Sequence, residues 1–414
     1  TARPELCFQH IPGFRTPDWA KGAVMYQIFV DRFRDGNSAN DVDTDEYLYI
    51  GLPVQHIENW DEKPSAFDVG YFYGGDLSGV REKFAYLKDL GVEVIYFNPL
   101  FVSPSNHKYD TQDYEHIDPH LTVIAEDGGE LLPAEAGDNL NATRYQKRSA
   151  DPKNLEASDR FFAAFTEEAH RFGFRILLDG VFNHCGSFHK WLDREKIYAR
   201  EGGYAPGAYL TPDSPYRKYF VFADKRPEAW PDNKSYDGWW DNDTLPKLNY
   251  EASPELAEQI LEVGEKWLKP PYQVDGWRLD VAADLGHSPD YNHSFWQRFR
   301  NRVKAVREDA LILAEHYGSP ASWLNGREWD SVMNYDGFME PVSWFLTGME
   351  KHSDSRDTGL RGNGAHFWDK MSLAMAKLPE PSLHTAMNQL SNHDHSRFLT
   401  RTNGRVGRLA ELGS

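Results

Sequence analysis

Residues 274–280 carry the pair of side chains with the clearest chemical potential in this sequence. They read Val-Asp-Gly-Trp-Arg-Leu-Asp, so Arg278 and Asp280 stand two positions apart. In a strand, alternate side chains share a face, which places the guanidinium beside the carboxylate. A neighbouring positive charge favours the ionised carboxylate by lowering its pKa. Such a carboxylate can act as the nucleophile in glycosidic bond cleavage, although a purely structural ion pair at a strand end is an alternative.

Three further apolar runs end in polar residues of the same kind. These runs are residues 174–184, 311–315 and 385–394, which end in Asn183-His184, in Glu315 and in His393-Asp394. Several polar strand ends in one chain make a shared site more plausible than four separate ion pairs.

The runs of strand character alternate with segments of helical periodicity, which predicts a parallel sheet with right-handed crossovers. The expected strands are residues 23–30, 94–100, 174–184, 274–280, 311–315, 331–335 and 385–394, and the expected helices are residues 77–90, 157–172, 254–268, 294–307 and 367–378. Polar ends of separate strands converge only if the sheet closes, so we expect a (β/α)₈ TIM barrel with its site at the carboxyl ends. A doubly wound sheet is the alternative, but the Gly-rich phosphate loop typical of that fold is missing after residues 23–30.

Length and charge narrow the class of protein. The chain has 414 residues, enough for one large α/β barrel domain with an insertion, and a net charge of −19. That charge argues against nucleic acid or an anionic membrane surface as a partner. No apolar run is long enough for a transmembrane span. The two cysteines, Cys7 and Cys185, indicate no disulfide framework.

The expected organisation is a barrel interrupted by an inserted domain. We assign residues 1–18 to a tail or linker, 19–184 to the first barrel part with a long loop at 103–156, 185–252 to an inserted domain B, and 253–414 to an incomplete second barrel part. Because residues 121–154 lack clear periodicity, we expect that stretch to be functional or partly mobile.

An eighth strand is not readable after Asp394. The chain starts at Thr1 and shows neither an eighth strand nor a C-terminal β-domain, so we expect these residues to belong to a longer polypeptide. Unpaired edges of an incomplete barrel would be costly, so the missing strand should come from a downstream segment. Direct pairing of residues 23–30 with residues 385–390 would contradict this expectation.

A loop rich in Asp and Asn follows the first expected strand. Asp35, Asn37, Asn40 and Asp41 supply hard oxygen donors around Gly36, a pattern that suits Ca²⁺ as well as a solvated acidic turn. Further along, Asp76 follows Gly74 and Gly75 at the position of a helix N-cap, which explains that residue without a ligand.

Four motifs in this order and spacing resemble those of the α-amylase superfamily, glycoside hydrolase family 13. They are Asp179 to His184, Gly276 to Asp280, the strand end at Glu315, and Asn392-His393-Asp394. Residues 245–249, Leu-Pro-Lys-Leu-Asn, are similar to the mark of the neopullulanase, cyclomaltodextrinase and amylopullulanase branch, as are residues 74–76 and 106–110. The resemblance covers about residues 19–397.

The resemblance implies a role for each matching residue. Asp280 would be the nucleophile, Glu315 the acid/base and Asp394 a third carboxylate that binds sugar hydroxyls. The sugar would also contact Tyr109, His184 and His393, and Arg278 would keep Asp280 charged. In a retaining enzyme the two reacting carboxyl groups lie about 5–5.5 Å apart.

The implied activity is retaining hydrolysis of α-1,4 glucosidic bonds, with α-1,6 bonds as an additional option, in starch, pullulan or malto-oligosaccharides. A glucanotransferase or isomerase of the same family is one alternative. A non-catalytic glucan-binding homologue is another, although such proteins lose carboxylates that this chain keeps. After Asp280 the chain reads Val-Ala-Ala-Asp where cyclodextrin-cleaving members have Asn-Glu after Val-Ala, which disfavours cyclodextrins as substrates.

The resemblance also implies calcium. The ligands expected by position are Asp35, Asn37, Asn40, Asp41, the carbonyl of Gly74, and Asp76, while Asn183 matches a second calcium position of the family. An α-glucan is the expected partner, and the oligomeric state is open, with a dimer among the options. The compartment is also open, with an extracellular or cell-surface location favoured over a cytoplasmic one.

Overall fold

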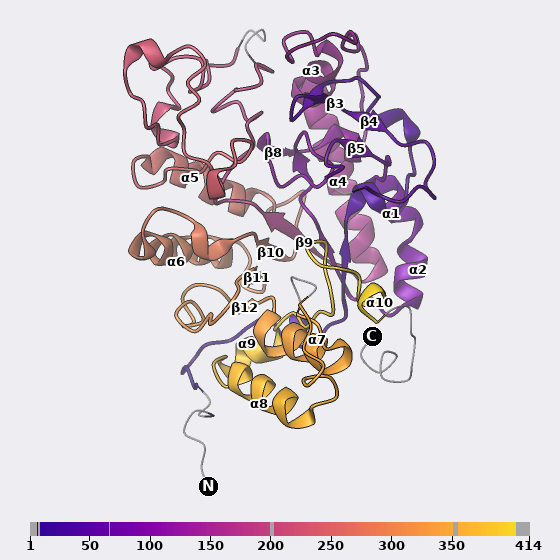
Figure 1. Cartoon of the computed structure of the whole chain (residues 1–414), viewed down its shortest axis with the longest axis vertical. Coiled ribbons are helices and arrows are strands. Elements are labelled where there is room, and N and C mark those ends of the chain that lie inside the picture. Colours follow the sequence, from indigo (N-terminus) through magenta and orange to yellow (C-terminus); the bar gives the residue numbers. More distant parts are fainter. Residues whose placement is uncertain (1–5, 7–8, 66, 199–202, 351–354, 403–414) are drawn as a thin grey trace.

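The computed structural model describes residues 6, 9–65, 67–198, 203–350 and 355–402 (Figure 1). At its centre is a sheet of six parallel strands that pair in the order of the sequence: β1 (Met25–Ile28), β6 (Val94–Phe97), β9 (Arg175–Gly180), β10 (Gly276–Leu279), β11 (Leu311–Ala314) and β12 (Ser331–Val332). A doubly wound sheet reverses its strand order at a switch point, and this sheet does not. The curled sheet is consistent with part of a TIM barrel.

Alternation along the strands creates two packed faces. On one face Val94, Leu177 and Leu313 form a small buried cluster. On the other face Ile95 and Ile176 belong to the large core that the surrounding helices share. The strands therefore read as continuous apolar runs, as expected for a parallel sheet buried on both faces.

Helices surround the sheet, with α5 and α6 on one flank and α1, α2 and α4 on the other (Figure 1). The helices are α1 (Leu77–Glu82), α2 (Phe84–Asp89), α3 (Thr143–Ala150), α4 (Pro152–Phe172), α5 (Pro254–Lys266), α6 (Pro289–Val306), α7 (Glu340–Thr347), α8 (Gly364–Met375), α9 (Glu380–His384) and α10 (Phe398–Arg401). Outside the central sheet lie the short strands β2 (Leu48–Tyr49), β3 (Leu52–Pro53), β4 (Gln55–His56), β5 (Tyr71–Phe72), β7 (Phe101–Val102) and β8 (Asp113–Ile117).

The three longest helices begin with the same local chemistry. A side-chain oxygen of Asp151, Ser253 or Ser288 caps the N-terminus of α4, α5 or α6, and a proline occupies the first helical position each time. The cap satisfies a free backbone N–H, and proline has no N–H to satisfy there. Because α4 and α6 begin earlier than their apolar periodicity, the caps rather than the apolar residues set the helix starts.

Two expected elements differ in the structure. The helix predicted over residues 77–90 is divided at Lys83, whose N–H donates to the Val80 carbonyl three residues back at 3.0 Å and so tightens the turn. The prediction of a strand over residues 385–394 is wrong, because only Met387 in this segment forms a bridge, which is parallel and pairs it with Met333. Its two-residue neighbour β12 offers too short an edge for a longer ladder.

The first and sixth strands are the edges of the described sheet. Within the described residues β1 pairs with β6 and not with residues 385–390. Pairing of β1 with residues 385–390 would have contradicted the expectation that a strand is missing, and it is not observed there. The N–H of Gly22 donates to the carbonyl of His384 at 3.1 Å, just before β1.

The segment expected to lack regular structure contains a helix, α3. Its sequence, Thr-Arg-Tyr-Gln-Lys-Arg-Ser-Ala, buries Tyr145, Gln146, Arg148 and Ser149. Hydrophobic periodicity does not reveal a helix whose buried face is polar. The prediction that residues 121–154 lack regular structure is therefore wrong for the residues of α3.

The described part of residues 185–252 forms turns, single bridges and three short 3₁₀ helices, Arg217–Tyr219, Pro227–Ala229 and Trp239–Asp241. Among its buried aromatic residues, Trp191, Tyr219 and Phe222 belong to the same core as the sheet and its helices, whereas Phe188 and Tyr198 belong to a second cluster. The described part of this segment thus shares the barrel core, and its status as a separate inserted domain stays a prediction.

Two sequence expectations concern single features of the chain. No helix in the described ranges is long and apolar enough to span a bilayer. Cys185 is buried as a free thiol, and Cys7 lies outside the described residues.

A buried ionic chain fixes residues 103–150 to the preceding loop. His120 lies between Asp118 and Glu46, with ring nitrogens 2.9 and 3.1 Å from their carboxylate oxygens. Lys108 pairs with Asp118 at 2.6 Å, and Arg148 of α3 pairs with Glu46 at 2.9 Å. Burial disfavours the charged imidazole, but Glu46 and Asp118 outweigh it and raise the pKa of His120 to about 9.

We predict that this histidine makes stability depend on pH. Because its folded pKa exceeds the unfolded value of about 6.5, its contribution is complete below pH 6.5 and is lost as the pH rises through 9. His120→Gln should lower the free energy of unfolding by roughly 3 kcal/mol at pH 6 and by much less at pH 9.5. Urea unfolding at both pH values measures the difference, and an equal loss at both would contradict a charged His120.

Candidate active site

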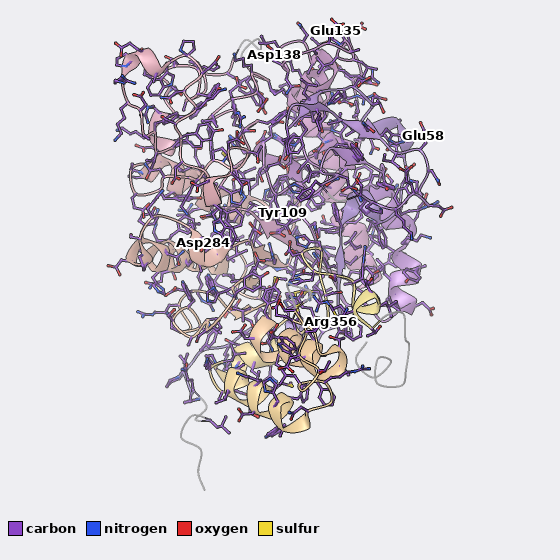
Figure 2. All side chains as sticks on the ribbon, in the orientation of Figure 1. Glu58, Tyr109, Glu135, Asp138, Asp284 and Arg356 are labelled. Carbon is purple, nitrogen blue, oxygen red and sulfur yellow. The ribbon has the colours of Figure 1, made fainter. Side chains whose placement is uncertain are left out.

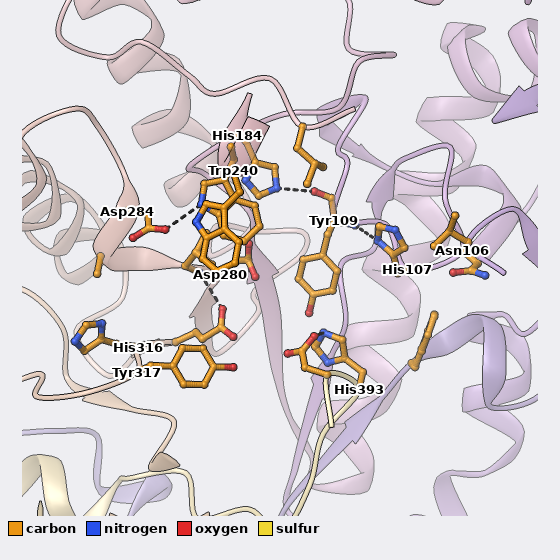
Figure 3. A pocket seen from close by; sticks show the side chains of 18 of the residues that line it. Asn106, His107, Tyr109, His184, Trp240, Asp280, Asp284, His316, Tyr317 and His393 are labelled. Carbon is orange, nitrogen blue, oxygen red and sulfur yellow. Dashed lines mark hydrogen bonds and ion pairs between the residues drawn. The ribbon is translucent and has the colours of Figure 1, made fainter. Parts of the chain in front are cut away.

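A cavity of about 690 Å³ opens where the carboxyl ends of β9, β10 and β11 meet (Figure 3). Six of the predicted site residues line it: Tyr109, His184, Asp280, Glu315, His393 and Asp394. They come from segments up to 285 positions apart, Tyr109 to Asp394, and meet near the middle of the molecule, where Figure 2 labels Tyr109. Arg278, the seventh, is fully buried beside the carboxylates.

The close pairing of β10 and β11 depends on a glycine. At Gly276 an added Cβ would lie 2.2 Å from the carbonyl oxygen of Leu311. Only a residue without a side chain allows the two backbones this distance. The pairing in turn sets the register Arg278↔Asp179 on one side and Arg278↔Leu313 on the other.

The guanidinium of Arg278 contacts carboxylates from three neighbouring strands. Its Nη1 lies 2.8 Å from Asp280 Oδ1 and 3.0 Å from Asp179 Oδ1, and its Nη2 lies 3.0 Å from Glu315 Oε2. The predicted proximity of Arg278 and Asp280 is therefore present. Glu315 also accepts a hydrogen bond from the backbone N–H of Val281 at 3.0 Å.

One cation among three carboxylates leaves excess negative charge. Burial raises the pKa of Asp280 well above its usual range, Arg278 opposes that shift, and Glu315 and Asp179 add to it. Arg278 lowers the pKa of Asp280, as predicted. The net shift is nevertheless upward, so the expectation of a lowered pKa for Asp280 is wrong.

Tyr109 and the two histidines form one wall of the cavity. The Tyr109 hydroxyl donates to Asp179 Oδ2 at 2.8 Å, and its ring stacks on His393 with centroids 5.1 Å apart. Burial lowers the pKa of both His184 and His393 to about 3, so both rings are neutral. The ring nitrogens of His184 already have protein partners, the Tyr109 carbonyl and the Asn183 amide.

Asp394 is the most accessible of the three predicted catalytic carboxylates. Its side chain is 42% exposed, against 9% for Asp280 and 6% for Glu315. Its Oδ1 lies 3.2 Å from His393 Nε2. An accessible carboxylate at the rim can exchange water for the hydroxyl groups of a ligand, whereas Asp280 and Glu315 lie deeper in the cavity.

Residues 239–247 supply a second wall that sequence reasoning missed. Trp239 stacks on His184 with centroids 5.2 Å apart and donates from Nε1 to Asp284 Oδ2 at 2.9 Å. Trp240 lines the cavity and is 79% exposed. The density of tryptophan and tyrosine in residues 185–252 was visible in the sequence, but nothing in its spacing indicated which rings reach the cavity.

Several of the expected calcium ligands lie close together. Gly74 lies against Asp41, because a Cβ on it would lie 2.5 Å from Asp41 Oδ1. Asn40 and Asp41 each bury an Oδ1 that accepts no hydrogen bond, and the Asn40 amide lies 3.4 Å from Asp76 Oδ2. Asp76 also caps α1 by accepting from the Gly79 N–H at 2.6 Å.

Asp35 and Asn37 each accept a hydrogen bond from a nearby backbone N–H group, of Asn37 and Ala39, and the Asp35 charge contributes to the raised pKa of both Asp41 and Asp76. Burial raises the pKa of Asp41 to about 7 and that of Asp76 to about 6. No group of three or more His, Cys, Asp or Glu within the described ranges could hold a metal. The donors that meet here are amide and carbonyl oxygens with two carboxylates, the hard mixture that Ca²⁺ accepts.

At the second expected calcium position, Asn183, the positive charge comes from a lysine side chain. Lys247 Nζ donates to Asn183 Oδ1 at 2.8 Å and to the carbonyl of Asp284 at 2.7 Å. Because an ammonium group already occupies that oxygen, the geometry around Asn183 does not favour a calcium ion.

Comparison with known proteins agrees with this geometry. Residues 27–127 and 158–412 match the model for the α-amylase family, "Alpha amylase, catalytic domain". The chain is 34% identical to the amylopullulanase of Thermoanaerobacter thermohydrosulfuricus over 93% of its length and to neopullulanase 2 of Thermoactinomyces vulgaris over 96%. It spans 25% of the first relative and 55% of the second.

Solved structures give the same result. The type III pullulan hydrolase of Thermococcus kodakarensis is 28% identical with a TM-score of 0.68, over 95% of this chain and 58% of that one. A cyclic α-maltosyl-(1→6)-maltose hydrolase of Arthrobacter globiformis is 28% identical with a TM-score of 0.69, over 96% of this chain and 71% of that one. The chain therefore belongs to the α-amylase family, whose catalytic domain it carries.

Proposed function

We propose that this chain is a retaining α-glucan hydrolase that cleaves α-1,4 bonds, with α-1,6 bonds as further candidates, in starch, pullulan or malto-oligosaccharides. The observation that carries the proposal is the contact of one guanidinium with both reacting carboxylates. Arg278 reaches Asp280 through Nη1 at 2.8 Å and Glu315 through Nη2 at 3.0 Å. Two carboxyl groups held by one guanidinium are close together, and close carboxyl groups favour retention over inversion.

Each carboxylate then has a separate task. Asp280 attacks the anomeric carbon, and Glu315 gives a proton to the leaving glycosidic oxygen. Water later releases the covalent glycosyl group after it loses a proton to Glu315. Asp394 binds hydroxyl groups of the reacting sugar from the more accessible rim, and the neutral His184 and His393 shape the wall beside it.

The names of the relatives support the substrate class. Amylopullulanase, neopullulanase and pullulan hydrolase all refer to pullulan, and maltogenic α-amylase refers to maltose release. A glucanotransferase would use the same glycosyl intermediate with a sugar as acceptor, so the products separate the two functions. Pullulan digestion is the direct test, because panose, isopanose and maltotriose each report a different cleaved bond.

We predict that Asp280→Asn abolishes hydrolysis while glucan binding remains. The loss should be at least about four orders of magnitude in kcat, because the removed charge acts on the reacting carbon. Glu315→Gln should impair glucans strongly and activated aryl glycosides much less. Asp290→Asn, an exposed carboxylate on α6, is the matched control.

Two results would contradict the proposal. One is near-normal hydrolysis by Asp280→Asn with binding unchanged. The other is a product whose anomeric configuration, followed by NMR during the reaction, is inverted relative to the substrate.

We further propose Ca²⁺ as a structural ion, held by Asn40, Asp41, the Gly74 carbonyl and Asp76. The two buried acceptor oxygens without hydrogen bonds support this proposal. When bound, the ion would neutralise the carboxylates and link the loop after β1 to the start of α1. Asp35 and Asn37 would orient the loop backbone.

We predict that replacing Asp41 does not destabilise the metal-free protein, and that calcium stabilises the wild type much more than the variant. Its folded pKa of about 7 means that the charged carboxylate costs stability in the metal-free protein above pH 3.8. At pH 8 with a chelator, Asp41→Asn should therefore equal or exceed the wild type in Tm. With calcium at about 100 times its Kd, the wild type should gain about 2.7 kcal/mol and the variant little.

Thermal unfolding with chelator and with added calcium measures both effects, and Asp61→Asn, an exposed carboxylate, is the control. A wild-type Tm that does not respond to calcium removal would contradict the proposed ion.

A further inference from the structure

Val281, the residue after Asp280, has a backbone conformation that valine rarely adopts. Its φ of 36° and ψ of 45° lie in the left-handed region, where a β-branched side chain is crowded against its own backbone. Among the described residues one other β-branched side chain has a positive φ, that of Ile50 at 53°. Ile50 and Gly51 form the two-residue turn between β2 and β3, and such a turn requires positive φ at both positions. Val281 follows a parallel strand, where no hairpin imposes this conformation.

Helix α6 holds the backbone that follows Val281. The carbonyl of Ala282 accepts hydrogen bonds from Trp296 Nε1 at 2.8 Å and from Asn292 Nδ2 at 2.9 Å. Both donors belong to α6 and are buried. The N–H of Asp284 donates to the Val281 carbonyl at 2.9 Å and closes the turn. A strained conformation persists only where its surroundings fix it in this way.

The turn at Val281 takes the chain off the sheet ladder. Asp280 still donates its N–H to the Gly180 carbonyl at 3.0 Å, as a strand residue does. The next N–H, that of Val281, donates to the side chain of Glu315 instead, at Oε2 and 3.0 Å. The strained residue thus presents a backbone donor to a carboxylate of the candidate active site.

The two oxygens of Glu315 differ as a consequence. Oε2 receives the Val281 N–H and lies 3.0 Å from Arg278 Nη2, so two positive groups favour negative charge on it. Oε1 has a long contact of 3.5 Å with the Tyr335 hydroxyl. A proton on Glu315 is therefore better placed on Oε1 than on Oε2.

We propose that Val281 is a positioning residue for the acid/base: its α6-anchored, left-handed turn aims its N–H at Glu315 Oε2 and directs the transferable proton to Oε1. The inference rests on the proposed function. In the first step Oε1 gives its proton to the glycosidic oxygen, which takes the electron pair of the breaking bond to the anomeric carbon. In the second step water attacks that carbon and gives a proton to Oε1, while the bond from that carbon to Asp280 breaks and its electron pair returns to the Asp280 carboxylate.

The test first removes one of the hydrogen bonds from α6 to the Ala282 carbonyl and then removes the backbone strain at Val281. Trp296→Phe deletes the donor to Ala282 but keeps an aromatic ring, so the strained Val281 can relax and withdraw its N–H. We expect kcat/KM for an unactivated malto-oligosaccharide to fall about tenfold, and that for an activated aryl glycoside, which needs little acid assistance, to fall less than threefold. KM should change little.

The double variant Trp296→Phe with Val281→Gly separates positioning from simple loss of structure. Glycine adopts the left-handed conformation without strain, so the turn should survive with the weaker anchor. We expect the double variant to recover at least half of the lost kcat/KM, and Val281→Gly alone to raise Tm. Ile50→Gly is the matched control: it also replaces a β-branched residue at positive φ, but combined with Trp296→Phe it should recover nothing.

Three outcomes would overturn the inference: equal losses on both substrate classes, no recovery in the double variant, or recovery by Ile50→Gly as well. If Trp296→Phe does not fold, Asn292→Leu deletes the other α6 donor to the Ala282 carbonyl and gives the same comparison. A wild-type protein without activity on any α-glucan would instead overturn the proposed function, and this inference with it.

Discussion

The burial of Arg278 is the constraint on which the rest of the site depends. A guanidinium with no exposed surface must have all its charge balanced by protein groups, because removing its partners would leave a buried charge at a cost of several kcal/mol. Those partners come from β9, β10 and the end of β11, so the ion cluster exists only when the three strands pair in their observed register. A slip of one residue would turn Arg278 away from the carboxylates and into the helix layer. The register of the sheet and the geometry of the site are therefore one constraint.

The same cluster explains why the centre is polar in a sheet that is otherwise apolar. Below Arg278, Val94, Leu177 and Leu313 form a dry layer on the same face of the sheet. Above it lie the cavity and its carboxylates. Arg278 separates the two, with its Nε 3.4 Å from the sulfur of Met333 and its Nη atoms on the carboxylates. The excess negative charge at this boundary lowers the stability of the fold. The apolar packing of the layer below Arg278 offsets that loss by stabilising the strands.

The sequence predicted best those parts whose physics is local or strongly apolar. Strands β6, β9, β10 and β11 were predicted because a strand buried on both faces must be a continuous apolar run, and the polar residue that ends it must reach the cavity rim. Helix α3 could not be predicted in this way, because Arg148 on its buried face is stabilised by Glu46, which lies 102 positions earlier in the chain. The strand expected at residues 385–394 failed for the opposite reason: its composition is suitable, but the short β12 beside it limits pairing to Met387. The rings of Trp239 and Trp240 reach the cavity through an irregular turn that no periodicity reports.

Residues 245–249 illustrate how a motif acquires a physical meaning. Lys247 connects Asn183, just after β9, to the segment after Asp280 by donating hydrogen bonds to the Asn183 side chain and to the Asp284 carbonyl. The fully buried Leu248 donates its N–H to the Asn183 carbonyl at 3.2 Å, which fixes the lysine against the same strand end. Burial lowers the pKa of Lys247, and the carboxylates of Asp284, Asp237 and Glu251 oppose that shift. The motif thus joins a segment that shapes the cavity wall to the end of β9 and to the segment that follows Asp280.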